Sequence, residues 1–258
     1  MSLFKMRAFI PVSWRTTPRR SPRPAFLLLA AVAASLAVAI PLSSCVNVAS
    51  YTQPSLVRVI DASYVAPAVN VSIEGITIAS NIGQGSITAY ATVPANSAAP
   101  ITITETTGST SLVSTTGTVV AGAHHSIFLT DNGASSTGYT VTILEDQQVA
   151  AASGHSAFRF LNQAPKVGGV DIYMIPSSTT LANTTALVTD LAVGSTAGYI
   201  SFPSQTVTMV IVPTGLTTPK YTSATLALTG GEVRTVLIVD TQLTSNPPVN
   251  AYIADDVN

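Results

Sequence analysis

The residues best suited to bind a metal ion are the neighbouring histidines His124 and His125. They begin an apolar stretch that is typical of a β-strand, where successive side chains point to opposite faces. Two imidazoles on opposite faces cannot bind one ion, and His155 stands well apart from both. We therefore expect surface or edge histidines, and no metal site or cofactor.

Two pairs of adjacent acids, Glu145 with Asp146 and Asp255 with Asp256, are the next candidates, as calcium ligands. Neither pair has the spaced oxygen donors of a calcium loop, which favours charges at solvated turns or tails. The many serines include no Gly-x-Ser-x-Gly elbow. Since no acid, base or nucleophile is placed for chemistry, we expect no catalytic residue and no enzyme.

Cys45 is the only cysteine in 258 residues, and the residues before it have the layout of a signal peptide. Six basic residues and no acid accompany residues 26–40, an apolar run too short to span a bilayer. The order Leu-Ser-Ser-Cys at residues 42–45 resembles the bacterial lipobox, whose cysteine is acylated and becomes the new N-terminus. The sequence predicts a lipoprotein signal peptide over residues 1–44 and lipidation at Cys45; a plain secretory peptide that leaves this thiol free is the alternative.

Lipidation at Cys45 predicts a location in the bacterial cell envelope, with the membrane as a partner through the N-terminal lipid. Acyl chains contribute about 0.8 kcal/mol per buried methylene, so two or more hold a soluble domain stably. Val46 follows the cysteine instead of an aspartate, and by resemblance to enterobacterial sorting rules this favours the outer membrane, on its periplasmic or its surface side. Residues 45–54 then form a tether, and Met1 and Met6 both fit as the start of translation.

Removal of residues 1–44 leaves five basic residues and twelve acids, hence a formal charge of 5 minus 12, or −7. A surface this acidic repels phosphate backbones, which excludes nucleic acid as a partner. The mature chain, residues 45–258, has no Trp and no second cysteine, so it is neither a disulfide scaffold nor a CxxC metal or redox protein. Thr, Ser, Ala, Val and Ile dominate it, a composition that favours strands.

An internal repeat divides the mature chain. Three segments recur, the first at an offset of 101 and the others at an offset of 109: residues 57–73 with 158–174, 85–94 with 194–203, and 122–131 with 231–240. One eight-residue insertion within residues 176–183 explains the change of offset. The sequence thus predicts two tandem domains, residues 55–148 and 156–258, joined by a linker at residues 149–155. Because this linker has no apolar pattern, we expect each domain to fold independently.

Each repeat has the pattern of β-structure throughout. Apolar and polar residues alternate, for example in residues 69–73 and 207–211. Turn signals such as Glu74 followed by Gly75 interrupt this pattern at short intervals. About seven short strands per hundred residues predict two tandem antiparallel β-sandwich domains, immunoglobulin-like or prealbumin-like, after the N-terminal signal peptide.

Arg58 and Arg159 recur at matching places on the first strand of each repeat. Both are out of phase with their apolar neighbours, so they project from the outer sheet face or from the sandwich edge. They are candidates for contacting an anion or a sugar. The alternative that we favour is a structural role, in a salt bridge to an acid on the same face; the candidate acids are Asp61, Glu74 and Asp171.

Tyr90 and Tyr199 also recur at matching places, each just before a strand. A tyrosine at a strand corner commonly bonds through its hydroxyl to nearby backbone, so we favour a structural role over binding. By contrast, His124 and His125 have no counterparts in the second repeat, where Val233 and Arg234 stand. A metal site shared by the two repeats is therefore excluded.

The openings of the repeats point to a family. The first repeat has apolar-Arg-apolar-apolar, then Asp-Ala-Ser at residues 61–63 and Pro-Ala-Val-Asn-Val at residues 67–71. This order resembles the bacterial domain-of-unknown-function 4397 family (DUF4397), whose opening runs V-R-V-x-H-A-S-P-D-A-P-x-V-D-V. Asp61 and Asn162 replace the family's His, and the Ser-Pro-Asp turn is absent. The resemblance implies a secreted or lipid-anchored envelope protein, often with tandem domains, and it implies no activity.

Two classes of function remain. The first is a non-enzymatic structural or protein-interaction module of the cell envelope. The alternative is a carbohydrate-binding or adhesion module of the cell surface, which usually stacks sugar rings on exposed aromatic side chains. Because the mature chain has no Trp and few clustered Tyr, we favour an envelope protein over a surface glycan as the partner.

Overall fold

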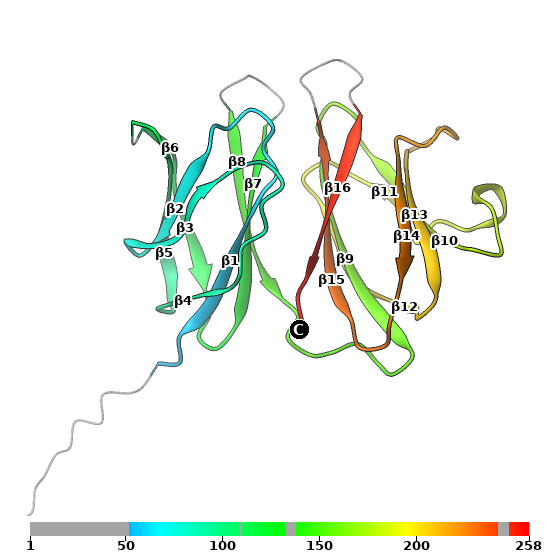
Figure 1. The fold of residues 1–258 in the computed structure, drawn as a ribbon, viewed down its shortest axis with the longest axis horizontal. Helices are drawn as coiled ribbons and strands as arrows, with labels where there is room; N and C mark the ends of the chain where they lie inside the picture. The colour runs from blue at the N-terminus through cyan, green and yellow to red at the C-terminus, as the bar shows by residue number, and fades with distance from the viewer. Residues whose placement is uncertain (1–51, 109, 133–137, 242–247, 258) are drawn as a thin grey trace, which may run out of the picture. The chain divides into compact units, whose positions relative to one another are not determined.

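The computed structural model describes residues 52–257 except 109, 133–137 and 242–247. Cys45 and the predicted signal peptide lie outside these described residues. The described chain forms sixteen β-strands and one short 3-10 helix, and the strands assemble into four four-stranded sheets (Figure 1). The prediction of an all-β fold is therefore confirmed. No helix within the described ranges is long and apolar enough to cross a membrane.

The first sandwich comprises strands β1 to β8. Their bounds are β1 (Ser55–Asp61), β2 (Val69–Ile73), β3 (Ile76–Ile82), β4 (Ala91–Val93), β5 (Asn96–Glu105), β6 (Ser111–Val119), β7 (His124–Asp131) and β8 (Tyr139–Asp146). One sheet has the order β4-β1-β7-β8 and the other β3-β2-β5-β6. Alternate side chains of both sheets, such as Val57, Val71 and Ile101, are fully buried in the core between them.

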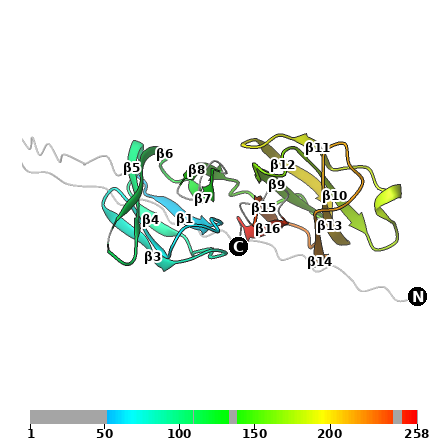
Figure 2. The ribbon, with the colours of Figure 1, turned by 90° about the horizontal axis from the view of Figure 1, so that it is seen from above.

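The second sandwich repeats this arrangement. Its elements are β9 (His155–Gln163), β10 (Val170–Pro176), the 3-10 helix η1 (Leu181–Asn183), β11 (Val188–Leu191), β12 (Thr196–Pro203), β13 (Thr206–Pro213), β14 (Tyr221–Ala227), β15 (Val233–Asp240) and β16 (Val249–Asp255). The sheet orders β12-β9-β15-β16 and β11-β10-β13-β14 match those of the first sandwich strand for strand (Figure 2). Two similar pairs of four-stranded sheets are what tandem sandwiches require.

One pair of strands in each sandwich differs from the antiparallel pairing that we predicted. β1 pairs with β7 in parallel, with Leu56 opposite His124, and β9 pairs with β15 in parallel. Parallel neighbours need a long crossover connection. The connection runs through β2 to β6 in the first sandwich and β10 to β14 in the second, and each of these stretches contains all four strands of the other sheet.

The predicted eight-residue insertion lies in the second sandwich, at the place where the first sandwich has a tight turn. In the first sandwich Glu74 and Gly75 join β2 to β3 with φ of 53° and 73°, the conformation of a two-residue hairpin turn. In the second sandwich the connection from β10 to β11 contains η1 instead. Leu181 of η1 packs against Ile175, Val210 and Val212 on the outer face of the sheet.

The two sandwiches meet through their sheets, a contact that the linker pattern did not predict; independent folding of each domain stays a prediction. The sheet of β1, β7 and β8 presents apolar residues on its outer face to the sheet of β9, β15 and β16. A cluster of buried residues joins the two: Ile60, Ala62 and Phe128 with Leu161, Leu237, Val239 and Ala254. We call this contact the junction. Because these strands are buried on both faces, burial along β7 and β15 is nearly continuous, and each has an apolar run instead of strict alternation, Ile-Phe-Leu in β7 and Val-Leu-Ile-Val in β15.

Candidate functional site

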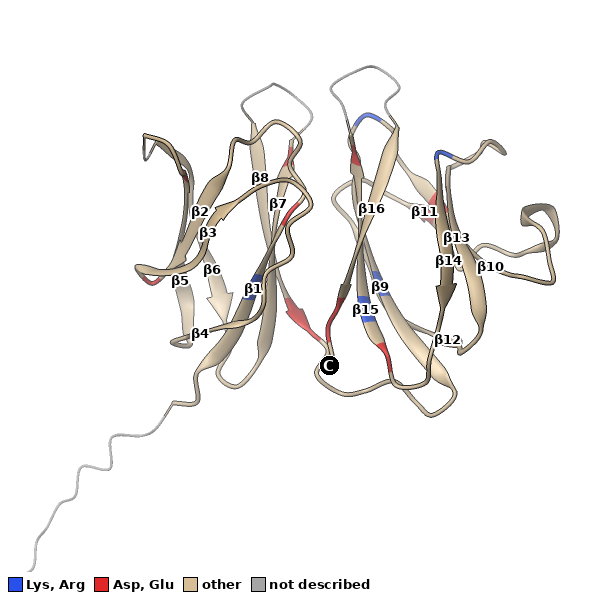
Figure 3. Cartoon of the chain, viewed as in Figure 1, with Lys and Arg blue, Asp and Glu red and all other residues tan. Residues whose placement is uncertain are grey.

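The duplicated arginines Arg58 and Arg159 both lie in the junction. Arg58 is 3% exposed and Arg159 is 4% exposed. Each projects from the outer face of its own sheet, as the phase of the strands predicts, but the other sandwich covers that face. Figure 3 shows basic segments on β1 and β9 and acidic segments at the ends of β8 and β16.

Arg58 bonds to both sandwiches. Its Nε donates to Ser126 Oγ of its own sheet at 2.7 Å. Its two terminal nitrogens reach across the junction, where one donates to the backbone oxygen of Asp255 and the other to the carboxylate of Asp256. This ion pair joins side chains 198 positions apart in the sequence.

Arg159 makes the reciprocal set of contacts. Its Nε donates to Thr235 Oγ1 of its own sheet at 3.0 Å. Across the junction its terminal nitrogens donate to the Glu145 backbone oxygen at 2.7 Å and to Asp146 Oδ1 at 2.5 Å. Each arginine therefore binds the end of the last strand of the other sandwich.

Asp146 and Asp256 correct the prediction of solvated acid pairs, because both side chains are fully buried in the junction. Asp146 also accepts hydrogen bonds from Ser126 Oγ at 2.7 Å and Tyr90 OH at 2.9 Å. Their neighbours Glu145 and Asp255 are exposed. Only one acid of each pair is therefore solvated, since adjacent strand residues point to opposite faces.

Asp256 has the matching partners in the second sandwich. It accepts bonds from Thr235 Oγ1 and Tyr199 OH, each at 2.7 Å. Burial raises the pKa of Asp256, and the hydrogen bonds from Thr235 and Tyr199 together with the charge of Arg58 oppose that rise. The four charged groups of the junction sum to zero, so the burial of each charge is compensated by a partner.

Tyr90 and Tyr199 lie beside the arginines. The guanidinium carbon of Arg58 is 4.8 Å from the ring centre of Tyr90, and that of Arg159 is 4.9 Å from the ring centre of Tyr199, a cation–π geometry. Their hydroxyls donate to carboxylates, not to nearby backbone as we expected; Tyr199 OH additionally accepts from the backbone nitrogen of Gln147 at 3.1 Å. Burial raises the pKa of both phenols, which keeps them protonated donors.

The three acids that we expected to pair with the arginines lie elsewhere. Glu74 accepts a bond from the Asn96 amide at 2.5 Å, and Asp171 accepts from the backbone nitrogen of Asp190 at 2.8 Å. Asp61 accepts from the backbone nitrogen of Ser63 at 3.1 Å. The prediction therefore named the wrong acids: Arg58 pairs with Asp256 of the other sandwich and lies 4.0 Å from Asp146 of its own, and Arg159 pairs with Asp146.

Asp61 is fully buried and its Oδ2 has no hydrogen-bond partner among the described residues. Burial raises its pKa to about 7; the Ser63 bond opposes the rise and the nearby Asp131 adds to it. The equivalent Asn162 is better satisfied, because its amide nitrogen donates to the backbone oxygens of Gly168 and Leu191, each at 2.8 Å. The two sandwiches thus differ at the position where the family motif has His.

The histidines do not form a site. His125 is 2% exposed, which corrects our expectation of a surface residue. Ser55 Oγ lies 3.0 Å from its Nδ1, and the backbone nitrogen of Val120 donates to its Nε2 at 3.4 Å. Burial lowers the pKa of His125, in keeping with a neutral ring held in the fold. The His124 ring lies 4.9 Å from the Tyr90 ring. Within the described ranges, no three His, Cys, Asp or Glu side chains gather as metal ligands.

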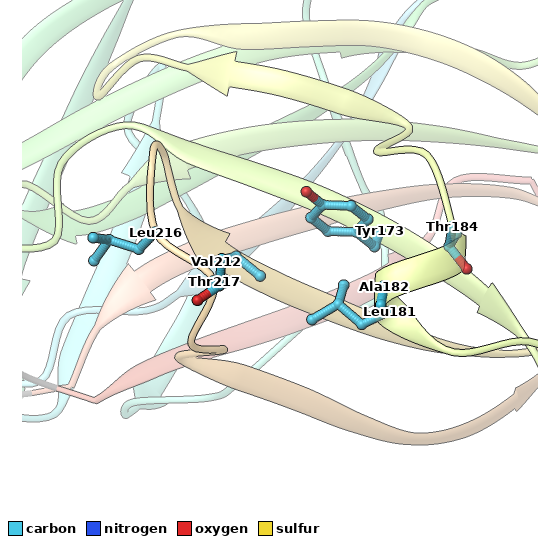
Figure 4. A pocket seen from close by; sticks show the side chains of 7 residues that line it. All are labelled: Tyr173, Leu181, Ala182, Thr184, Val212, Leu216 and Thr217. Carbon is cyan, nitrogen blue, oxygen red and sulfur yellow. The ribbon is translucent and has the colours of Figure 1, made fainter.

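A hollow of about 420 Å³ opens on the second sandwich beside η1 (Figure 4). Its lining is uncharged: Tyr173, Leu181, Ala182, Thr184, Val212, Leu216 and Thr217. Tyr173 pairs with Val210 across β10 and β13, whereas Ser72 pairs with Thr102 at the same place in the first sandwich. The apolar pair Tyr173–Val210 beside the hollow therefore has a polar counterpart in the first sandwich.

Sequence reasoning missed two members of the junction, Ser126 and Thr235, and interpreted two others, Asp146 and Asp256, as solvated. The hydroxyls of Ser126 and Thr235 fall within the aligned segments 122–131 and 231–240, so their recurrence was a signal. Each repeat also ends its last strand on an acid pair. The proposed structural role of Arg58 and Arg159 stays a prediction, but the junction now gives it a geometry that experiments can test.

The family described as Domain of unknown function (DUF4397) matches residues 55–173, which confirms the resemblance over that stretch. Among solved structures, the chain is similar to a carbohydrate-binding module of family CBM26 from Eubacterium rectale, in complex with maltoheptaose. The identity is 7%, over 78% of this chain and 96% of that chain, with a TM-score of 0.23, so this likeness carries no functional argument. No curated protein matches the chain.

Proposed function

We propose that this chain is a lipid-anchored, non-enzymatic module of the bacterial cell envelope, held at the outer membrane through Cys45, that presents two joined sandwiches to an envelope protein partner. One observation carries the proposal. The polar groups most capable of chemistry, Arg58, Arg159, Asp146 and Asp256, bond to one another in the junction and have no access to solvent. Charged side chains that bond to one another in a buried contact hold the two domains together and cannot act on a substrate.

The absence of an enzymatic role rests on the same geometry. A catalytic acid or base must lie within hydrogen-bond reach of its substrate. Asp146 and Asp256 each bond to three protein side chains and are fully buried, so a substrate cannot reach either carboxylate. The outer loops and sheet faces are therefore the surfaces on which we expect a partner to bind.

Metabolic labelling with a palmitate analogue tests the anchoring. The wild-type chain should carry the label and fractionate with membranes, whereas Cys45→Ser should lose the label. A labelled Cys45→Ser variant, or a wild-type chain free in the medium, would refute lipidation at this residue.

A carbohydrate-binding or adhesion role is the second candidate, and the hollow beside η1 favours it. The ring of Tyr173 and the hydroxyls of Thr184 and Thr217 line a neutral cavity, and sugar rings stack on aromatic faces. A glycan array probed with residues 46–258 separates the two candidates. Binding of a glycan by the wild type but not by Tyr173→Ala would favour the carbohydrate-binding role over the protein partner. Recovery of one envelope protein by cross-linking, with no glycan bound on the array, would favour the protein partner.

A further inference from the structure

Four segments of the first sandwich meet at the end where the chain enters β1. Val93 of β4 lies opposite Ser55, and the backbone nitrogen of Gly122 donates to the Pro54 oxygen at 3.2 Å. Ile76 shares one hollow with Thr52, Pro54 and residues 92–95. We call this surface, residues 52–54, 74–76, 92–95 and 119–122, the tether end.

The tether end is apolar and almost uncharged. Ile76 is 42% exposed and Val120 is 43% exposed, and the hollow of about 480 Å³ beside Ile76 is lined by Pro, Ala, Val, Ile and Thr side chains. Its ranges contain no Lys or Arg and one acid, Glu74, which accepts a bond from Asn96.

The same end of the second sandwich is polar, although the fold there is the same. Ser204 stands where the first sandwich has Ala95, and Thr229 where it has Val120. Close to them Arg234 Nη2 pairs with Glu232 Oε1 at 3.1 Å, and both side chains are partly exposed. The sandwich fold therefore does not require an apolar surface at this end, since the second sandwich has the same fold and a polar surface there.

We infer that the tether end is a membrane-contact surface, on which Ile76 and Val120 enter the interface between headgroups and acyl chains of the bilayer that holds Cys45. This inference rests on the proposed lipid anchor. Thr52 is seven positions after Cys45, so the surface lies at most about 25 Å along the chain from the lipid.

Tethering explains why a small apolar surface suffices. A short tether gives the surface an effective concentration on the order of millimolar at the bilayer, so weak contacts are populated. Without Lys or Arg, the contact depends on apolar burial, and we expect it on zwitterionic lipid and without strong dependence on salt. The mature chain as a whole has a formal charge of 5 minus 12, or −7, and is poorly suited to lie on anionic headgroups.

Single tryptophan probes test the contact, because the mature chain has no Trp. Residues 45–258 are coupled through Cys45 to a maleimide lipid on phosphatidylcholine vesicles that contain brominated acyl chains. The probes are Ile76→Trp and Val120→Trp, and the matched control is Leu216→Trp, at a 60% exposed residue of the second sandwich. We expect quenching and a blue-shifted emission at positions 76 and 120, and neither at position 216.

Chemical coupling separates this test from the test of lipidation in cells. Absence of quenching at both tether-end positions, with the chain bound to vesicles, overturns the membrane contact and leaves the proposed anchor intact. A blue shift at position 76 without quenching shows that protein, such as residues 46–51 or a second chain, covers the hollow, and it also overturns the inference. Equal quenching at position 216 does so too, because the chain would then have no preferred face.

Discussion

The junction and the tether end use the two repeats in opposite ways. In the junction the charged residues and tyrosines of one sandwich have counterparts in the other: each arginine pairs with the acid of the other sandwich, and each tyrosine donates to the acid of its own. At the tether end the counterparts differ, with Val120 facing solvent in one sandwich and Thr229 in the other. The residues that recur in both repeats connect the two sandwiches, and the residues that differ give each sandwich a different exposed surface.

The outer sheet faces extend the same contrast. Ser72 and Thr102 form a polar cross-strand pair in the first sandwich, and Tyr173 and Val210 form an apolar pair in the second. The insertion with η1 covers part of this apolar pair and leaves a hollow beside it. The second sandwich has thus gained a surface feature without any change to its half of the junction.

The largest expected effect is the loss of one junction acid. Asp256→Ala removes the partner of Arg58 and the acceptor of Tyr199 and Thr235. Because the buried Arg58 loses its close ion pair and keeps only Asp146, at 4.0 Å from Nη2, we expect a loss of about 3 to 5 kcal/mol in the free energy of unfolding. Asp146→Ala should cost a similar amount if the junction is reciprocal, as measured by urea unfolding of residues 46–258.

A double variant is the control for this loss. Arg58→Met with Asp256→Leu removes both charges and fills the space with apolar groups, so most of the lost stability should return. A loss below about 1 kcal/mol in Asp256→Ala, or a large loss in only one of the two alanine variants, would contradict the reciprocal junction.

The second prediction concerns Asp61, where the sandwiches differ inside the fold. Its pKa is raised from 3.8 to about 7, so its contribution to stability is fully present below pH 3.8 and is lost as the pH rises through about 7. Asp61→Asn, which copies Asn162, should therefore stabilise the chain by roughly 2 to 4 kcal/mol at pH 8 and have little effect at pH 4. Equal effects at both pH values in thermal unfolding would show that the fold does not raise the pKa of Asp61.

The third prediction separates the two tyrosines. Tyr199 OH makes two hydrogen bonds, to Asp256 and from the Gln147 backbone nitrogen, whereas Tyr90 OH donates to Asp146. At about 1 kcal/mol per bond, Tyr199→Phe should cost about 2 kcal/mol and Tyr90→Phe about 1 kcal/mol. Phe retains the ring beside the arginine, so urea unfolding of the two variants measures the hydroxyls alone. A larger loss for Tyr90→Phe would reverse the assignment.

The smallest effect is expected for an arginine outside the junction. Arg234 pairs with Glu232 and with Asp255 Oδ1 at 2.8 Å, on the partly exposed face of β15. Arg234→Ala should change the free energy of unfolding by about 0.5 kcal/mol or less, because exposed pairs contribute little. A change as large as that of the Asp256 variant would mean that burial in the junction is not what makes an ion pair strong in this protein.

Much of the fold could be predicted from the sequence, since alternation and the repeat offsets both depend on local patterns. Alternation at residues 69–73 and 207–211 and the matching segments led to paired all-β sandwiches. The parallel pairing of β1 with β7 could not be predicted in this way, because alternation is the same in both kinds of sheet.

The candidate site was only half predictable. The strand phase placed Arg58 and Arg159 on the outer face correctly, but their partners are set by packing between sandwiches, which no local pattern encodes. The continuous apolar runs of β7 and β15 were the available signal, because strands buried on both faces lose their alternation. The pair at Asp255 and Asp256 was interpreted as solvated for the same reason: the covering sheet was missing from the argument.

Cleavage of the linker tests most directly whether the junction holds the sandwiches together. A protease site placed between the exposed residues Val149 and Ala150 allows the folded chain to be cut without change to the junction. Size-exclusion chromatography of the cut chain should show both halves eluting as one complex, and the same cut in Asp256→Ala should let them separate. Separation of the wild-type halves, each with a β-sheet circular dichroism spectrum, would contradict the account.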